Sequence, residues 1–492
     1  MKTERIHRYF AAIDFGTTHI KTGVISDQGE EMMILAADTP VEHDADGFYY
    51  DPGTIAALVM HQLKEAADHY ELSGVGITGM AEAGVMIDRD TKQPLSKLIP
   101  WYDRRTECYA SELTKTQEKE GFLRTGLRNS FKYGVYKYRW CLDHLGYPAE
   151  RTMWLSAADY LFLILTGETK TDPTYAVRTF LYDIRTGAWS KEAMQQFGVT
   201  KEQLPQVVPS GSFSGLWRLN GKEIPVAVCG HDHLCAAFGL IAGKDVIFNS
   251  CGTAETYIEV MDSLPDNEIR EASGLIYGPF VDGTSYFCMG NLSSSGQSVE
   301  WFRSLSGSEP LPYQKINELL EQAGSEPGSV YYFPYLSGVG TPSFQSGASG
   351  AFLGLRAGTT QADLIKAVIE GIGYQGRRIL ECGCSEGVPI LCCGGAVRNP
   401  FWMQCKADIT NRPVFASDRS EGTLYGAIVL LCRKNGLPMD RPNDSRDVYI
   451  PDAEHARSYQ IRYQNYFLPA LKNSARLFLK TEFYAILVSC GI

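Results

Sequence analysis

The chain has 492 residues, too many for one hydrophobic core, so we expect two large domains or more. Its formal net charge of -11 argues against a surface built for nucleic acid or an anionic membrane. No apolar run reaches the roughly 18 residues that a membrane span needs, and no apolar leader precedes the first predicted strand. The 13 cysteines form no C-x-x-C half-site, so we predict reduced thiols, no zinc, and a cytoplasmic protein.

The first informative stretch, residues 11–25, is an apolar run, a Gly-Thr-Thr turn and a second apolar run, which predicts a β-hairpin. Such a turn lets backbone and hydroxyl groups approach a phosphate, and Lys21 behind it can neutralise phosphate charge. Asp14, just before the turn, is placed to hold Mg²⁺ or its waters. The turn residues themselves are Gly16, Thr17 and Thr18. An ordinary hairpin with a polar turn explains the same pattern.

A strand over 30–35 and an amphipathic helix over 54–70 follow, and then a short buried strand over 75–78. This strand runs into Met80 and Glu82. A carboxylate at the end of a buried strand is where open α/β sheets usually hold their ligands, so this turn is a candidate substrate site. The alternative for Glu82 is an exposed turn acid.

Aromatic and charged residues then gather in two groups. Trp101 and Asp103, followed by two arginines, suit a polyhydroxylated ligand because rings cover C–H faces while charged groups bond hydroxyls. A surface salt-bridge cluster is the alternative. The second group is Tyr133, Tyr136, Lys137 and Trp140. Helical spacing puts its members on one face, so plain packing explains them equally well.

A capped buried helix over 157–167, a cap-and-turn loop at 171–174 and a helix from Lys201 onward precede the second decisive stretch. Over 226–239 a buried strand meets a glycine turn, Asp232 and a helix of small residues. An aspartate there can accept the proton of a substrate hydroxyl during loose, metal-assisted phosphoryl transfer. The structural interpretation of Asp232 is a helix N-cap, a role that it can combine with catalysis.

Two histidines, His231 and His233, flank Asp232. Their H-x-H spacing raises the possibility of a metal site, but the sequence offers no third ligand, so we predict none there.

The opening pattern recurs over 245–258, where a strand, a Gly252-Thr253 turn and a second strand follow each other. Two such hairpins predict a duplicated domain in which each half lends a phosphate clamp to a shared cleft. We place the boundary near Gly243, which gives an N-terminal domain over 1–243 and a C-terminal domain over 244–492.

The second half continues with a helix start at 293–301, a glycine-rich loop at 335–342 and a long helix over 361–381. A strand over 389–393 ends in a glycine pair, which lets the backbone approach a flat ligand such as adenine. A further helix spans 417–432, and the tail after Pro451 is predicted to be helical and peripheral.

Assembled, these stretches resemble the FGGY family of carbohydrate kinases from Ala12 to about Cys432. The most specific match is the run 350–355 together with 363–371, which fits the C-terminal signature of the family. Residues 156–187 are also very similar to the family.

The resemblance implies an α/β protein of two actin-like, ribonuclease H-like domains, the fold shared by sugar kinases, Hsp70 and actin. These domains would close on ATP, Mg²⁺ and a sugar or polyol, and a homodimer is a family-level expectation. Asp232 falls on the catalytic base and Asp14 on the magnesium-associated aspartate, with Asp232 also near the metal. The implied substrate-binding residues are Met80, Glu82, Trp101, Asp103, Tyr133 and Asp232. The implied nucleotide contacts are Gly16, Thr17, Thr18, Lys21, Gly252, Thr253, Gly296, Glu300, Gly395 and Asn399.

The chain also departs from the family. Ala81 stands where glycerol kinases carry an arginine, which argues against glycerol. Xylulokinases carry Gly-Asp-Asn around the catalytic aspartate, where this chain has His231-Asp232-His233. The Gly-Glu-Arg-Thr-Pro loop of the family is replaced at 338–342 by a run without charges. These differences concern the substrate and leave the chemistry intact.

We therefore predict an ATP-dependent kinase for a hydroxyl of a sugar, ketose or polyol, more similar to xylulokinase than to glycerol kinase. One alternative is a catalytically silent regulator that binds nucleotide and sugar, although it would have no need of Asp14, Lys21 and Asp232 together. Another is an actin- or chaperone-like ATPase, which leaves the Glu82 and Asp103 clusters without a role. The sequence does not identify the sugar, the hydroxyl that is phosphorylated or the oligomeric state.

Overall fold

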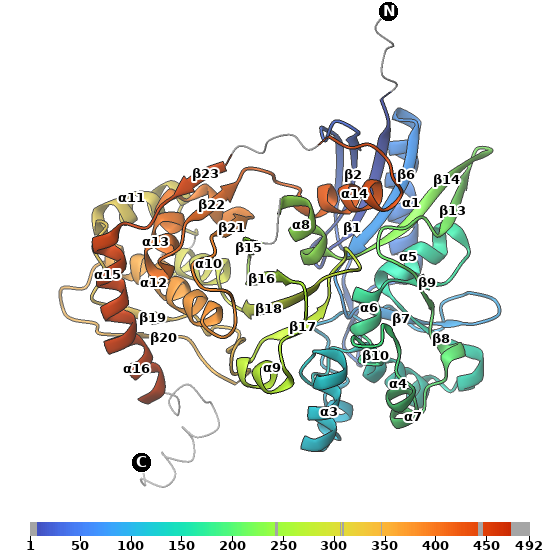
Figure 1. Cartoon of the computed structure of the whole chain (residues 1–492), viewed down its shortest axis with the longest axis horizontal. Coiled ribbons are helices and arrows are strands. Elements are labelled where there is room, and N and C mark those ends of the chain that lie inside the picture. The colour runs from blue at the N-terminus through green and yellow to red at the C-terminus, as the bar shows by residue number, and fades with distance from the viewer. Residues whose placement is uncertain are drawn as a thin grey trace, which may run out of the picture.

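The computed structural model describes residues 7–241, 245–305, 307, 309–345, 347–440 and 446–473. The chain forms two halves, each built around a mixed β-sheet with helices on its faces (Figure 1). The predicted boundary at Gly243 lies outside the described residues, so its position stays a prediction. Within the described residues, no helix is long and apolar enough to span a membrane.

The sheet of the first half has the strand order β13-β14-β6-β1-β2-β3. β1 pairs antiparallel with β2, which closes the predicted hairpin, and parallel with β6, which in turn pairs parallel with β14. The carboxyl ends of β1, β6 and β14 therefore meet at one edge. The six strands are β1 (Tyr9–Phe15), β2 (His19–Ser26), β3 (Glu31–Asp38), β6 (Leu72–Gly79), β13 (Gly215–Leu219) and β14 (Lys222–His231).

Helices cover this sheet because their apolar faces match it. α1 (Pro52–His69) buries Ile55, Val59 and Leu63, as its helical spacing predicted. α5 (Ala157–Thr166) is buried along most of its length. The other elements of this half are β4 (Glu42–His43), β5 (Phe48–Tyr49), β7 (Gly84–Asp88), α2 (Glu107–Ser111), α3 (Lys115–Thr125), α4 (Gly134–Leu145), η1 (Ala149–Arg151), β8 (Thr152–Ser156), β9 (Lys170–Thr171), α6 (Pro173–Val177), β10 (Tyr182–Asp183), β11 (Ala188–Trp189), α7 (Lys191–Phe197), η2 (Lys201–Gln203), β12 (Gln206–Val207) and α8 (Asp232–Leu240).

The predicted helix from Lys201 is wrong. The structure has only the single 3-10 turn η2, and Leu204 is extended. Pro205 explains the difference, because it disfavours helical geometry at the preceding residue and has no amide proton to continue the helix.

The second half repeats the strand arrangement of the first. β15 pairs antiparallel with β16 and parallel with β21, and β21 pairs parallel with β22. An antiparallel strand closes the edge in both sheets, β13 beside β14 and β23 beside β22. The strands are β15 (Ile247–Cys251), β16 (Glu255–Met261), β17 (Ile276–Pro279), β18 (Tyr286–Leu292), β21 (Ile390–Cys393), β22 (Val414–Ser417) and β23 (Arg446–Tyr449). The repeat agrees with the predicted duplication.

The long predicted helix is present as α12 (Gln361–Leu380), which lies in the core of this half with α13 (Pro400–Thr410). The remaining elements are α9 (Asn267–Ser273), α10 (Gly296–Ser304), α11 (Tyr313–Ala323), β19 (Tyr331–Phe333), β20 (Ala351–Leu353), η3 (Gly395–Arg398), α14 (Gly422–Lys434), α15 (Ala453–Arg462), η4 (Tyr463–Phe467) and α16 (Leu468–Asn473).

The described part of the tail, residues 453–473, is helical as predicted, but the expectation that it is peripheral is wrong there. Tyr459, Tyr463 and Phe467 are fully buried, and the rings of all three pack against Tyr374 of α12. Their spacing of four residues places them on one face of a helix, and this aromatic face completes the core of the second half.

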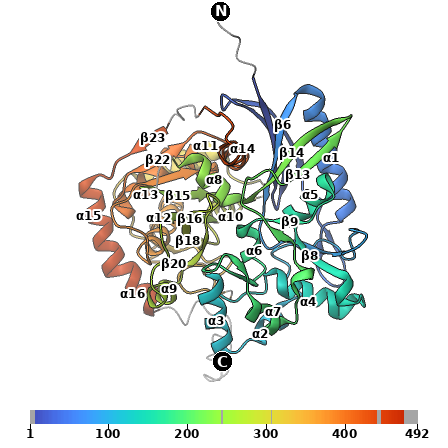
Figure 2. The ribbon, with the colours of Figure 1, turned by 45° about the vertical axis from the view of Figure 1, so that its right-hand side comes forward.

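Helix α14 crosses back from the second half to the first sheet. It begins at Gly422 rather than at Ser417, which belongs to β22, and it packs against α8 (Figures 1 and 2). The two helices touch at their glycines, since a Cβ on Gly239 would lie 2.5 Å from the Cα of Gly426. This crossing brings Glu421 next to the first hairpin.

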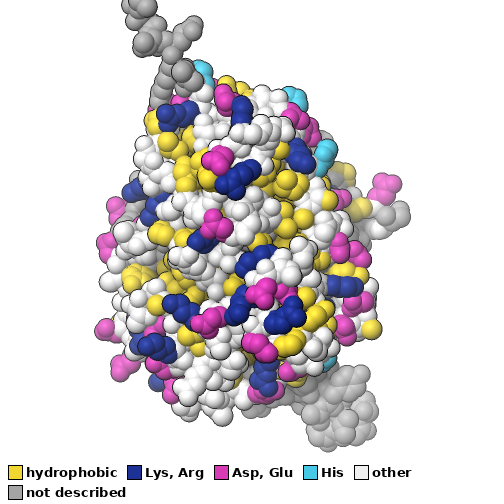
Figure 3. All heavy atoms as spheres, turned by 90° about the vertical axis from the view of Figure 1, so that its right-hand side faces the viewer, with side chains coloured by type: hydrophobic (Ala, Val, Ile, Leu, Met, Phe, Trp, Pro, Cys, Tyr) yellow, Lys and Arg dark blue, Asp and Glu magenta, His cyan; other side chains and the backbone are white. Residues whose placement is uncertain are grey.

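The surface agrees with the composition. On the face shown in Figure 3, which belongs to the first half, basic and acidic side chains are interspersed. The described cysteines are free thiols, as predicted.

Candidate active site

The residues singled out at three strand ends lie together. Phe15 and His231 are both register partners of Gly79, the last residue of β6. Asp14 therefore stands just inside this edge, and Asp232 and Glu82 follow just after it. The parallel pairing of β1, β6 and β14 is the physical reason that acids so distant in sequence converge.

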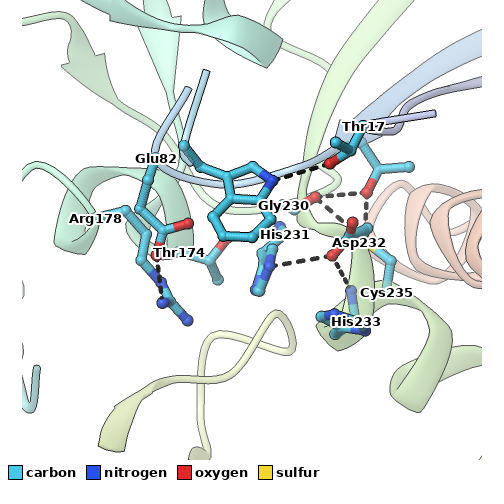
Figure 4. A network of polar contacts seen from close by, with 12 residues as sticks. Thr17, Glu82, Thr174, Arg178, Gly230, His231, Asp232, His233 and Cys235 are labelled. Carbon is cyan, nitrogen blue, oxygen red and sulfur yellow. Dashed lines mark hydrogen bonds and ion pairs between the residues drawn. The ribbon is translucent and has the colours of Figure 1, made fainter. Parts of the chain in front are cut away.

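Asp232 is the first residue of α8, and His231 occupies the cap position, so the N-cap interpretation of Asp232 does not hold. Its Oδ1 accepts a hydrogen bond from the amide of His233 at 2.6 Å and lies 3.1 Å from Nε2 of His231 (Figure 4). Burial raises the pKa of Asp232, although His233 opposes the shift. Burial lowers the pKa of His231 well below its usual value, so this ring is neutral.

The turn before Asp232 is fixed by residues that sequence reasoning missed. Gly230 has a φ of 107°, and its carbonyl accepts hydrogen bonds from the hydroxyls of Thr78 at 2.6 Å and Tyr175 at 2.9 Å. The amide of His231 donates to the hydroxyl of Thr174 at 3.0 Å (Figure 4). The sequence does not show which hydroxyl groups will bond to this turn. Their contacts with it arise only when the chain folds.

Asp14 lies opposite Lys21 across the hairpin, and its Oδ1 is buried without a hydrogen-bond partner among the described residues. Burial, together with the negative charge of Asp232, raises the pKa of Asp14 to about 8 against the opposing charge of Lys21. Two carboxylates that repel each other, one with a free oxygen, fit a hard divalent cation with oxygen ligands such as Mg²⁺.

Lys21 has a partner that the sequence did not reveal. Its Nζ lies 2.8 Å from Oε1 of Glu421, at the start of α14. Lys21, predicted to neutralise phosphate charge, therefore joins the two halves in this structure. A cavity of about 450 Å³ adjoins this pair and is lined by residues 394–395, 397–398, 416–421 and 447. Gly395, predicted to contact the adenosine, lies in this lining.

The first hairpin turn is closed by its own backbone. The amide of Gly16 donates to the carbonyl of His19 at 3.0 Å, and Thr18 is exposed. The hydroxyl of Thr17 accepts a hydrogen bond from the indole of Trp101 at 2.9 Å. The predicted phosphate turn and the predicted substrate aromatic are thus in direct contact.

The second hairpin is clamped to the start of α10. The amide of Gly296 donates to the carbonyl of Gly252 at 3.1 Å, and the carbonyl of Thr253 accepts from the amides of Ser295 and Gln297. A Cβ on Gly296 would lie 2.6 Å from the Gly252 oxygen, so this contact requires glycine. Three of the predicted nucleotide contacts therefore form one unit.

A buried ion pair contacts this unit through Ser295. The sequence analysis did not predict it. Lys406 of α13 lies 3.0 Å from Glu255, and both side chains are fully buried. The second carboxylate oxygen of Glu255 accepts from Ser295 at 2.9 Å, and Lys406 also contacts Asn249. Burial disfavours the charge of Lys406, yet interactions with Cys251 and Glu255 raise its pKa well above the usual value.

Glu82 follows β6 in a left-handed conformation with a φ of 63°. Its carboxylate lies 2.7 Å from Nη1 of Arg178, and both side chains are largely buried (Figure 4). The exposed-turn alternative is therefore wrong. Lys137 donates to the Glu82 carbonyl at 2.6 Å, and burial lowers the pKa of Lys137 to about 7.

The other predicted substrate residues are positioned by the chain itself. Asp103 is buried, and its carboxylate accepts from the amide of Phe48 at 2.7 Å and from the guanidinium of Arg105 at 2.7 Å. The Asp103–Arg105 pair of the predicted salt-bridge cluster is buried, whereas Arg104 is exposed and pairs with Glu107. Tyr133 stacks on Phe180 with its ring centroid 5.1 Å away and donates to the carbonyl of Arg128. Met80 is also buried.

Two predicted nucleotide contacts have other partners. Glu300 is half exposed and pairs with Arg303 at 2.6 Å, with Tyr313 also in contact. Asn399 caps α13 by accepting from the amide of Trp402 at 3.0 Å, and it donates to Asn317. Their roles toward a nucleotide stay predictions.

Two groups of described residues bring potential metal ligands together, and one of them shares Asp232 with the expected magnesium site. His231, Asp232 and His233 bring three potential ligand atoms within 4.8 Å of one another, the third being the aspartate between the two histidines. Glu259 of β16, Cys288 of β18 and Cys384, which follows α12, do the same.

Family models match both halves of the chain. The model of the "FGGY family of carbohydrate kinases, N-terminal domain" matches residues 9–239, and the C-terminal domain model matches residues 247–434. A glycerol kinase from Limosilactobacillus reuteri (strain DSM 20016) is 28% identical over 461 residues, which cover 88% of this chain and 90% of the relative. A glycerol kinase from Parabacteroides distasonis is 30% identical over 452 residues, covering 86% of this chain and 89% of the relative.

Solved structures share the fold at lower identity. A gluconate kinase from Lactobacillus acidophilus has a TM-score of 0.86 at 20% identity, and a xylulose kinase from the same organism has 0.85 at 19%. Each alignment covers 96% of this chain and 99% of the solved chain. The predicted two-domain actin-like fold and the prediction of an ATP-dependent carbohydrate kinase are confirmed. This chain belongs to the FGGY family of carbohydrate kinases.

Proposed function

We propose that this chain transfers the γ-phosphoryl group of Mg-ATP to a hydroxyl of a sugar, ketose or polyol, with Asp232 as the base. The observation that carries the proposal is the convergence of Asp14, Glu82 and Asp232 at one sheet edge beside a Gly-Thr hairpin. Each acid has its own environment, and each therefore suits a separate task in phosphoryl transfer.

Asp232 takes the proton of the attacking hydroxyl. The burial that raises its pKa increases its basicity, and the amide of His233 fixes one of its oxygens so that the carboxylate keeps one orientation. Neutral His231 lies beside it without competing for the negative charge.

Asp14, with Asp232 nearby, is the group that would hold Mg²⁺. When bound, the ion would neutralise charge that develops on the transferring phosphoryl group. The unpartnered Oδ1 of Asp14 supports this assignment.

The nucleotide would lie between the halves, with its phosphates at the two hairpins. Gly16, Thr17 and Thr18 come from the first half, and the Gly252, Thr253 and Gly296 unit comes from the second. The cavity beside Gly395 suits the adenosine, with Asn399 and Glu300 as further candidate contacts. Lys21 would exchange Glu421 for a phosphate when ATP binds.

The substrate would lie against Glu82 and Trp101, with Met80, Asp103 and Tyr133 shaping the wall behind them. The glycerol kinases among the relatives and the xylulose and gluconate kinases among the structures differ in their named substrates. The preference for a xylulokinase-like over a glycerol substrate rests on Ala81 and stays a prediction.

Free thiols suit the cytoplasm, which we propose as the location of this protein. A homodimer stays a family-level prediction.

The test is ADP release with Mg-ATP against ketoses, aldoses, polyols and sugar acids, for the native chain and for Asp232→Asn. We expect one compound to stimulate ADP release and Asp232→Asn to lower kcat by about 10²–10⁴-fold with ATP affinity unchanged. Asp46→Asn, an exposed aspartate in a loop of the same half, is the control and should leave turnover unchanged.

Each other result has a definite meaning. Near-normal turnover of Asp232→Asn removes Asp232 from the mechanism. Silence across the panel, with ATP and a sugar both bound in calorimetry, identifies the silent regulator. ATP turnover that no sugar stimulates identifies an actin- or chaperone-like ATPase.

A further inference from the structure

Two cationic donors near Glu82, on Lys132 and Arg178, lack an acceptor among the described residues. Glu82 is paired with Arg178, and Asp103 with Arg105, so each of these two predicted substrate acids already has its own guanidinium. A third basic residue, Lys132, lies in the same region. Within the described part of the chain, its ammonium makes no hydrogen bond or ion pair and lies 4.9 Å from the centroid of the Trp101 ring.

Lys132 is held beside Glu82 by a buried brace. The ammonium of Lys137 donates to the carbonyl of Glu82 at 2.6 Å and to the carbonyl of Lys132 at 2.7 Å. One side chain thus ties together the two backbone segments that carry the acid and the unpaired base. Lys137 is completely buried, so it is not itself available to a substrate.

The Trp101 indole beneath Lys132 contacts the hairpin that is proposed to bind phosphate. Trp101 donates to Thr17 of the first phosphate hairpin at 2.9 Å. The Lys132 ammonium is therefore placed over the predicted substrate aromatic and not on the outer surface. Burial lowers the pKa of Lys132 although the charge of Glu82 opposes this, as expected for a cation without its own counter-ion.

Arg178 supplies a second unsatisfied donor. Nη1 binds Glu82, but Nη2 is buried and has no hydrogen-bond partner among the described residues. The whole side chain is only 8% exposed. Figure 4 shows the Glu82–Arg178 pair on the opposite side of the view from Asp232, with His231 between them. A buried, charged donor without an acceptor is costly unless a ligand supplies one.

We propose that the substrate is a carboxylated sugar, such as an aldonic acid, and that Lys132 and Arg178 bind its carboxylate. This proposal rests on the proposed kinase function and names the substrate class for that site. A carboxylate supplies the missing negative charge for Lys132 and an acceptor for Nη2 of Arg178. A hydroxyl of a neutral polyol can accept one hydrogen bond but leaves the buried cation uncompensated. The remaining hydroxyls would bind Glu82 and stack their C–H faces on Trp101.

The test uses matched acid and alcohol pairs, D-gluconate with D-glucitol and D-glycerate with glycerol. Binding is measured by calorimetry without ATP, and turnover by ADP release with Mg-ATP. For the native chain we expect the acid of one pair to bind about ten- to a hundredfold more tightly than its alcohol. Lys132→Met keeps the apolar stem over Trp101 and should abolish this preference by raising the KM of the acid, with a smaller effect on kcat.

Two further variants control for folding and for charge in general. Lys132→Arg keeps a cation at the same position and should restore most of the preference for the acid. Lys64→Met removes an exposed lysine on α1 and should leave both members of each pair unchanged. If Lys132→Met lowers the melting temperature strongly, the contrast between Lys132→Arg and the native chain still measures the effect of geometry at a retained charge.

The outcomes separate the two proposals. If the alcohols bind as tightly as the acids, the carboxylate assignment is overturned, whatever the turnover. If a neutral sugar is phosphorylated well and no acid is, the kinase function stands and the acid proposal fails. If the acid binds through Lys132 but no compound is phosphorylated, the kinase function fails and the anion site stands.

Discussion

At the second hairpin, the backbone of Gly252 and the start of α10 approach each other so closely that only glycine fits at residue 296. Gly296 donates its amide to the carbonyl of Gly252, and any side chain at Gly296 would collide with that oxygen. The same carbonyl belongs to the turn proposed to bind phosphate. The distance between α10 and the hairpin is therefore set by the absence of one Cβ.

We expect Gly296→Ala to raise the KM for ATP about tenfold, because the added methyl pushes the hairpin away from α10. The KM for the sugar should not change, since the substrate groups belong to the other half. Steady-state kinetics with each substrate varied in turn checks this. Gly358→Ala, at a glycine whose Cβ would meet nothing within 4 Å, is the control. An unchanged KM for ATP would mean that the hairpin does not contact the nucleotide.

At the scale of the element, two helices begin with the same capping motif, but the capping acid is buried in one and exposed in the other. Ser156 and Asp159 form a capping box at the start of α5, and Thr360 and Asp363 form one at the start of α12. Burial raises the pKa of Asp159 to about 7, whereas hydrogen bonds from Thr360 lower the pKa of the exposed Asp363. Asp159 is therefore largely protonated in the folded chain below neutral pH.

The raised pKa predicts a pH dependence of stability. Between pH 4 and 7 the folded chain keeps a proton on Asp159 that the unfolded chain releases, so stability falls as pH rises through this window. Asp159→Asn mimics the protonated acid and should remove this part of the slope, at most about 1.4 kcal/mol per pH unit. Melting temperatures from pH 4 to 7.5 measure it. Asp363→Asn should leave the slope in this window unchanged; equal slopes for native chain and Asp159→Asn contradict the prediction.

At the scale of the whole molecule, the two halves are linked at the site itself. Lys21 of the first hairpin pairs with Glu421, which precedes the helix that packs on α8. Any phosphate that binds Lys21 must compete with this carboxylate. Nucleotide binding and the contact between the halves are therefore coupled through one lysine.

We expect Glu421→Gln to bind ATP more tightly, by about three- to tenfold at low salt, because Lys21 is released for the phosphate. Lys21→Met should weaken binding, and the double variant should resemble Lys21→Met. Calorimetry with ATP at two salt concentrations measures both. Glu223→Gln, which removes an exposed pair with Arg218, is the control. Weaker binding by Glu421→Gln would instead make Glu421 a ligand of the nucleotide or its metal.

The sequence by itself determined the two hairpins, the duplicated architecture and the positions of Asp14 and Asp232. Alternating or continuous apolar runs and glycine turns are local signals, so they are readable along the chain. The family signature over 350–371 extended this to the enzyme class. The same local signals failed at Pro205, where one residue ended a helix.

Only the tertiary structure decided which charges pair. Lys21 and Glu421 are separated by 400 residues, Lys406 and Glu255 by 151, and Arg178 and Glu82 by 96. The sequence shows that a residue is charged but not which residue it will pair with. The partner depends on which strand ends and helices the fold brings together. For the same reason only the structure shows that Lys132 has no counter-ion among the described residues, the observation on which the proposed carboxylate site rests.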